Sequence, residues 1–217
     1  MKKYLIYLLA IVCVLGSSCK KDKHLTGGST HDPKVNVSTY DYLKANPLFD
    51  TLVQLIDRAG LKEQVDGAVT FFAPTDYSIR DLMLRRTDTI QIRYNNENLK
   101  YTIDSFPVAE LRDSLSAYLF DGSIERAGLS TNDKVFKNKV NEDFSVRLIE
   151  TDSYTGVVST APLYVYLIRI RNGLDPQDNA SVPLPDRDNR QLIQTSGILT
   201  TTGVLHVINN YHVFYWE

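Results

Sequence analysis

Hydrophobic residues recur at helical intervals in the first half of the folded chain. After Pro47, leucine and isoleucine return every three or four residues, which predicts a helix as far as Ala59, where Gly60 follows as a stop signal. The same spacing predicts further helices at residues 39–46, 61–65, 77–85 and 108–119.

Strand patterns follow the helices and dominate the second half. Residues 69–73 form a compact apolar run that Pro74 ends, and alternation around residues 95–98 predicts a β-hairpin with strands at 89–94 and 99–103. Later strands are expected at 134–140, 144–150, 156–159, 163–171, 192–195, 203–209 and 211–216. The stretch 173–189 is rich in Pro, Asp and Asn and is expected to be a loop. Helices first and strands later predict an α+β domain.

The N-terminus has the pattern of an export signal. Two lysines precede an apolar run at residues 4–15, and Gly16, Ser17 and Ser18 lead into Cys19. This run is well short of the roughly 20 residues that a spanning helix needs. Small residues before a Cys resemble a bacterial lipobox, so we expect a signal peptide over 1–18, acyl chains such as palmitate on Cys19, and a flexible tether over 19–36. A secretory signal cut nearby is the alternative.

Charge and cysteine content narrow the setting. The net charge of −2 gives no broad basic surface, which argues against nucleic acid as a partner. Cys13 lies in the removed segment and Cys19 would carry lipid, so the mature domain has no thiol for a disulfide. Lys20, rather than Asp, follows Cys19, which favours the outer membrane of a Gram-negative cell, with the periplasmic or outer side left open.

Two segments carry a family resemblance. Residues 69–76, Val-Thr-Phe-Phe-Ala-Pro-Thr-Asp, and 202–209, Thr-Gly-Val-Leu-His-Val-Ile-Asn, resemble the two signatures of fasciclin domains, and residues 46–61 are similar to the opening helices of that family. The resemblance implies one domain over 37–217. Its fold would be N-terminal helices on a wedge-shaped, mostly antiparallel β-sandwich, with the hairpin at 87–103 as an insertion. The signature residues, expected to be structural, are Thr70, Phe72, Ala73, Pro74, Thr75, Asp76, Gly203, His206, Val207 and Ile208.

Physical roles can be assigned to several signature residues. Thr75 or Asp76 is expected to cap the helix that follows, because Thr and Asp side chains accept hydrogen bonds from free N–H groups in a first turn. Residues 204–208 are apolar on both faces, so their strand should be central. His206 is expected to be buried and hydrogen-bonded.

Two departures from the family pattern weaken an integrin-type adhesion function. Animal matrix domains of this family carry an Asp-Ile pair upstream of the second signature, and here Gly197-Ile198 takes that place. Many members carry a Tyr-His pair on a central helix, and here the pair is Tyr118-Leu119.

No catalytic motif is found, and no cofactor is expected. The sequence lacks a Gly-x-Ser-x-Gly elbow, a phosphate-binding glycine loop and a His-Glu-x-x-His site. On a continuous strand, His206 and His212 would lie about 20 Å apart, too far to share one metal, although a turn at Asn209-Asn210 would change this separation. Residues 175–179 and 186–189 offer oxygens to calcium, but a solvated polar loop is the simpler interpretation.

Aromatic residues are the remaining binding signal. Tyr211, Tyr215 and Trp216 close the chain, and Tyr164 and Tyr166 share a strand face. Exposed rings of this kind stack on the C–H faces of sugars, whereas buried ones pack a core. Both interpretations stay open, with core packing favoured.

These observations predict a non-catalytic cell-envelope lipoprotein, accessory to glycan or nutrient capture at the outer membrane. Its partners would be the membrane, through the lipid, and a glycan or envelope protein. A cell-surface adhesion or matrix protein is the alternative. A glycoside hydrolase would need paired carboxylates, and nothing in the sequence marks such a pair.

Overall fold

The structure is a computed structural model that describes residues 32–151, 161–176 and 180–216. The predicted signal peptide, Cys19, most of the tether and the expected strand at 156–159 lie outside these residues. Residues from Pro33 onward form one compact unit, and every member of its hydrophobic core lies at or after Val35. The unit therefore has a complete core of its own and is expected to fold without the first 32 residues.

The first helices are short. They are α2 (Thr39–Lys44), the 3₁₀ turn η2 (Pro47–Phe49), α3 (Asp50–Ala59) and α4 (Lys62–Val65). Ser38 accepts a hydrogen bond from the Asp41 N–H at the start of α2, and Gly60 adopts a left-handed φ of 66° that ends α3. The helix predicted from Pro47 therefore begins as a 3₁₀ turn.

Among the described residues, seven strands form one hydrogen-bonded series in the order β2-β1-β7-β6-β5-β4-β3. β7 lies centrally, parallel to β1 and antiparallel to β6, as its two apolar faces predict. The strands are β1 (Val69–Ala73), β2 (Leu119–Asp121), β3 (Val135–Lys137), β4 (Asp143–Glu150), β5 (Leu163–Arg169), β6 (Asn189–Leu199) and β7 (Val204–Ile208).

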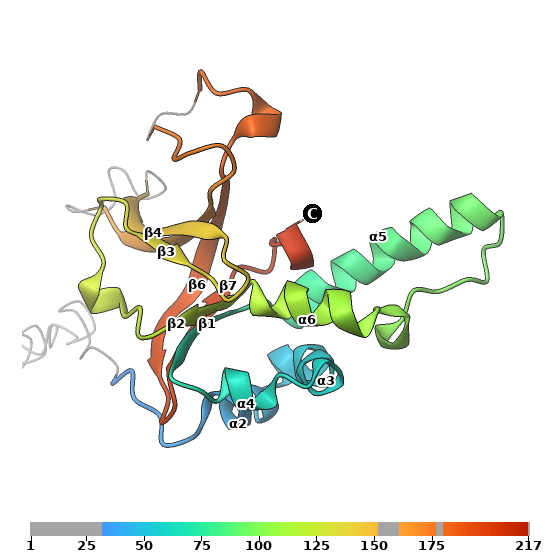
Figure 1. Ribbon diagram of the computed structural model, residues 1–217, viewed down its shortest axis with the longest axis horizontal. Coiled ribbons are helices and arrows are strands. Elements are labelled where there is room, and N and C mark those ends of the chain that lie inside the picture. The colour runs from blue at the N-terminus through green and yellow to red at the C-terminus, as the bar shows by residue number, and fades with distance from the viewer. Residues whose placement is uncertain (1–31, 152–160, 177–179, 217) are drawn as a thin grey trace, which may run out of the picture. The chain divides into compact units, whose positions relative to one another are not determined.

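The sheet curls so that its two ends meet. Asn138, just after β3, forms an isolated bridge with Phe120 of β2, and the Lys139 N–H donates to the Leu119 carbonyl. Phe120 and Phe144 of β4 meet edge to face inside the curl, 5.4 Å between centroids. The helices lie beside the β1 and β7 part of the sheet (Figure 1). Helices packed on a mostly antiparallel sheet agree with the predicted α+β class.

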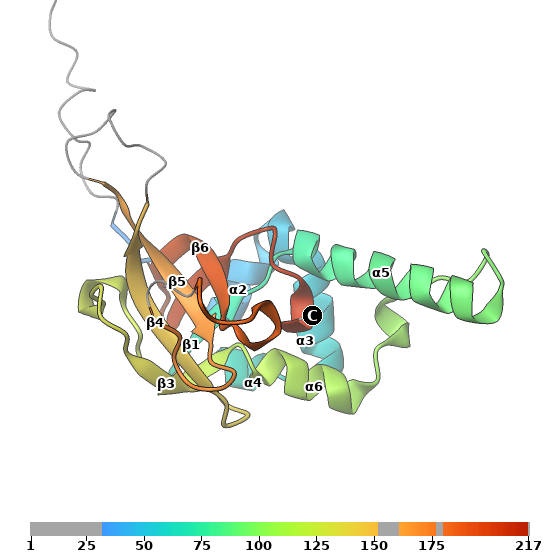
Figure 2. The same cartoon turned by 90° about the horizontal axis from the view of Figure 1, so that it is seen from above.

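The predicted hairpin at 87–103 is wrong. Residues 76–94 form one continuous helix, α5 (Asp76–Tyr94), which extends past α6 (Val108–Ser116) in both views (Figures 1 and 2). The returning segment supports it, because the Tyr101 N–H donates to Thr87 Oγ1 and Gln91 Nε2 donates to the carbonyl of Leu99. The alternation suggested a strand because the hydrophobic residues here are not arranged on one buried helix face. Ile92, for example, is 82% exposed.

Further boundaries also differ from the sequence-based expectations. α6 ends at Ser116, and Leu119 already belongs to β2, whereas one helix was expected over 108–119. The loop at 173–189 contains the 3₁₀ turn η6 (Leu184–Asp186). In the part of the chain that the structure describes, no helix combines the length and apolar character needed to cross a bilayer.

Candidate functional site

The two signature segments are neighbouring strands. β1 and β7 pair in parallel from Thr70 opposite Val204 to Ala73 opposite Val207. Thr70 Oγ1 donates to the Gly122 carbonyl and accepts from the Ile124 N–H, so its buried hydroxyl ties β1 to the loop after β2. Gly203 is required at the start of β7, because a Cβ there would lie 2.2 Å from the Val69 carbonyl oxygen.

His206, a residue of β7 opposite Phe72, is a buried structural group. Its Nδ1 accepts from the Gly197 N–H at 3.2 Å, so its Nε2 donates to the Ile124 carbonyl at 2.7 Å, and its ring stacks on Phe72 at 4.7 Å. Burial lowers the pKa of His206 to about 4. The ring is therefore neutral and fully bonded at neutral pH. Val207 and Ile208 are also buried.

The expected helix cap is wrong in its target. Thr75 precedes α5 but makes no cap bond, and its hydroxyl donates to Asn210 Oδ1 at 2.9 Å. The Asp76 carboxylate instead accepts from the N–H groups of Thr51 and Leu52, at 2.9–3.1 Å, in the first turn of α3. The signature residue thus caps a different helix, across a tertiary contact.

The C-terminal aromatic segment is not a strand, contrary to expectation. A turn at Asn209 leads into the 3₁₀ turn η7 (Phe214–Trp216), in which Tyr215 and Trp216 have left-handed φ values of 72° and 61°. Tyr211 is 92% exposed and Tyr215 37%, but Trp216 is only 5% exposed. Trp216 therefore belongs mainly to the core, and of the three only Tyr211 and Tyr215 present substantial ring surface to solvent.

Tyr118 and His212 anchor this segment, although neither was assigned a role from sequence. The Tyr215 N–H donates to the Tyr118 oxygen at 2.9 Å, which leaves the Tyr118 hydroxyl proton for His212 Nε2 at 2.7 Å. Burial raises the pKa of Tyr118 and lowers the pKa of His212 to about 3. Because 94 residues separate the pair, no local pattern could have revealed it.

A polar cleft of about 500 Å³ adjoins this anchor. We call it the C-terminal cleft; its lining residues are Asp113, Ala117, Val140, Glu142, Arg169, Tyr215 and Trp216. Arg169 forms an ion pair with Glu142, whose other oxygen accepts from Asn138 Nδ2. The cleft thus combines an aromatic ring with anionic acceptors and a cationic donor.

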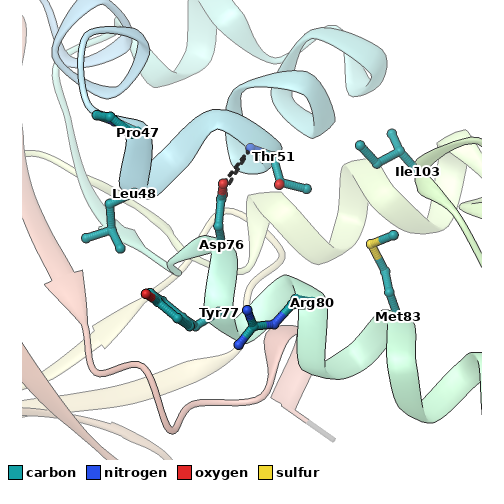
Figure 3. Close-up of a pocket in the computed structure, with 8 residues that line it drawn as sticks. All are labelled: Pro47, Leu48, Thr51, Asp76, Tyr77, Arg80, Met83 and Ile103. Carbon is teal, nitrogen blue, oxygen red and sulfur yellow. Dashed lines mark hydrogen bonds between the residues drawn. The ribbon is translucent and has the colours of Figure 1, made fainter.

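A second, more apolar cleft of about 530 Å³ lies between the start of α3 and the first turns of α5 (Figure 3). We call it the helical cleft; its lining residues are Pro47, Leu48, Thr51, Asp76, Tyr77, Arg80, Met83 and Ile103. The Arg80 guanidinium lies 4.9 Å from the centre of the Tyr77 ring. Of this set, only Asp76 was among the candidate site residues predicted from the sequence.

Acidic residues of the loop at 173–189 serve local structure. Asp175 and Asp188 each accept the other's backbone N–H at 2.9 Å, and Asp188 also accepts from the Arg171 N–H. Within the described ranges, no group of three or more His, Cys, Asp or Glu side chains is placed to hold a metal ion.

A fold of helices beside a curled, mostly antiparallel sheet, in which the two signature strands β1 and β7 are paired neighbours, defines the class of protein. The model of the fasciclin domain matches residues 47–213, and the chain belongs to the fasciclin family. Domains of this family typically serve adhesion or binding and are generally non-catalytic.

A solved structure shows the same fold. The FAS1 domain pair of the insect cell adhesion molecule Fasciclin I aligns with a TM-score of 0.51 at 12% identity, covering 79% of this chain and 49% of that chain. This chain therefore spans about half the length of the domain pair. A comparison with curated protein sequences gave no significant match.

Proposed function

We propose that this chain is a non-catalytic binding protein of the cell envelope, anchored by lipid at Cys19, and that its fasciclin domain takes a glycan in the C-terminal cleft. Support comes from Tyr215, which is 37% exposed beside Asp113, Glu142 and Arg169. The flat C–H face of a sugar stacks on a tyrosine ring, while carboxylates accept and guanidinium donates hydrogen bonds to hydroxyls. The volume of about 500 Å³ suits one or two sugar units.

The test uses a matched pair of tyrosines in the domain from Lys34 onward. Binding on a glycan array should be lost in Tyr215→Ala, with little change in melting temperature, because the contact of Tyr215 with Tyr118 uses its backbone N–H. Tyr211→Ala is the control, since Tyr211 is 92% exposed and does not line the cleft. Unchanged glycan binding in Tyr215→Ala would contradict the proposal. Palmitate labelling of the full chain and of Cys19→Ser tests the anchor separately.

Adhesion is the second candidate, favoured by the likeness to a fasciclin domain pair of an adhesion molecule. An integrin-type contact at Gly197 has little support, because Gly197 is buried, has a φ of 77° and gives its N–H to His206. Beads coated with the domain that aggregate or attach to cells, with no inhibition by free sugar, would favour adhesion over glycan capture.

A further inference from the structure

The helical cleft is an open apolar site whose apolar side chains are only partly buried in the core. Leu48, Met83 and Ile103 pack against the core with one side and remain partly exposed on the other. Figure 3 shows Leu48 on the α3 side of the cleft, with Tyr77 and Met83 on the α5 side. A volume of about 530 Å³ is in the range that takes a small organic ligand.

The negatively charged group of this cleft, the Asp76 carboxylate, is already hydrogen-bonded within the protein. Both oxygens of Asp76 accept backbone N–H groups, with Thr51 and Leu52 as donors, at the positive end of α3. Three of the roughly four lone-pair positions of this carboxylate are therefore occupied, which leaves a cationic ligand little of it to bind.

The positively charged group of this cleft, the Arg80 guanidinium, has no carboxylate partner among the described residues. Arg80 stands four residues after Asp76 on α5, the spacing of a helical ion pair, yet no ion pair joins Arg80 to any carboxylate among the residues that the structure describes. Its guanidinium instead lies against the exposed Tyr77 ring. The cleft therefore offers an apolar wall and one available planar cation.

We propose that the helical cleft binds a small aliphatic carboxylate. The tail lies against Leu48, Met83 and Ile103, and the carboxylate accepts two parallel hydrogen bonds from the Arg80 guanidinium. The shape and charge together select one anionic head and one apolar tail. A sugar is disfavoured, because the apolar wall would leave most of its hydroxyl groups without partners.

Calorimetry with three probes of equal tail length tests the head group. The domain from Lys34 onward is titrated with decanoate, decanol and decylamine below the concentrations at which they form micelles. Decanoate is expected to bind at least tenfold more tightly than decylamine, with decanol between them. Equal binding of decanoate and decylamine, or no binding of decanoate, would overturn the proposal.

Matched arginine variants test the location. Arg80→Gln should weaken decanoate at least fivefold and leave decanol unchanged, whereas Arg85→Gln, on the exposed surface of the same helix and outside the cleft, should change neither. Leu48→Glu should weaken both ligands, because it adds an anion to the apolar wall. If Arg80→Gln binds decanoate as the parent does, the site is wrong. Tyr215→Ala should leave decanoate binding intact, which keeps this result separate from the glycan proposal.

Discussion

The two clefts have similar volumes but differ in how they are joined to the core. Trp216 of the C-terminal cleft is buried and stacks on Tyr118, whereas Tyr77 of the helical cleft is 46% exposed. The floor of the C-terminal cleft is therefore part of the hydrophobic core, whereas most of the helical cleft lies on the surface of that core. In the C-terminal cleft, buried Trp216 couples the site to stability while the more exposed Tyr215 does not; in the helical cleft, the exposed Tyr77 is likewise largely separable from stability.

Chain topology explains this difference. The C-terminal cleft forms only when the end of the chain returns to α6 and β4, a contact that joins Tyr215 to Tyr118 across 97 residues. The helical cleft joins α3 and α5 through Asp76 and Thr51, which are 25 residues apart. A long-range contact that seals an aromatic core leaves less freedom to vary its residues than a nearer contact between two helices.

The largest expected effect tests this coupling with two aromatic truncations. Trp216→Ala should lower the free energy of unfolding by about 3–5 kcal/mol, because it empties a buried site that also contacts Phe144 and His212. Tyr77→Ala should change it by less than about 0.5 kcal/mol. Urea unfolding measures both, and equal losses in the two variants would remove the distinction between the clefts.

The second largest expected effect is a loss of stability in mild acid, caused by His206 in the sheet and by His212 at the C-terminal segment. An unfolded histidine takes up a proton below a pKa of about 6.5, but His206 and His212 resist protonation until about pH 4 and 3. Stability present above pH 6.5 is therefore lost as the pH falls. Between pH 7.5 and 5.5 each histidine should cost about 1.3 kcal/mol.

Urea unfolding at the two pH values measures this loss. His212→Gln serves as the comparison, because it should roughly halve the loss between pH 7.5 and 5.5 even if the variant is less stable at both. A pH dependence unchanged in His212→Gln would show that His212 is not buried as a neutral ring.

Asp76 is the residue of the helical cleft whose replacement is expected to lower stability. Asp76→Ala should cost about 1–2 kcal/mol, since it leaves the N–H groups of Thr51 and Leu52 at the start of α3 without their acceptor. Asp76→Asn retains one side-chain oxygen and should recover part of the loss. Thermal unfolding of the three proteins measures the series, and full stability in Asp76→Ala would refute the cross-helix cap.

The smallest expected effect compares the arginines of the two clefts. Arg169→Gln breaks the ion pair with Glu142, which is one-third exposed on both sides, and should cost less than about 1 kcal/mol, decreasing with added salt. Arg80→Gln should show no salt-dependent loss. A larger, salt-sensitive loss in Arg80→Gln would mean that Arg80 is paired in solution and not available to a ligand.

Local patterns predicted the strands whose residues are apolar on both faces. Strands were expected at residues 69–73 and 203–209, and they pair as β1 and β7. The second half of α5 was misinterpreted because Ile92 and Tyr94 are exposed, so its hydrophobic residues follow no buried face and alternate by chance. Its helical state depends instead on partners from the return segment, such as Tyr101 and Leu99.

The amino-acid sequence by itself determined the family, the α+β class and the central position of the strand at 204–208, because signature spacing and two-sided apolarity are local properties. Tertiary structure alone decided that Asp76 caps α3, that Tyr118 bonds His212 and that Trp216 turns inward. Each of these depends on a hydrogen-bond acceptor or a ring supplied by a distant segment. The positions of both clefts follow from such contacts, since a cleft is the space left between elements once they have packed.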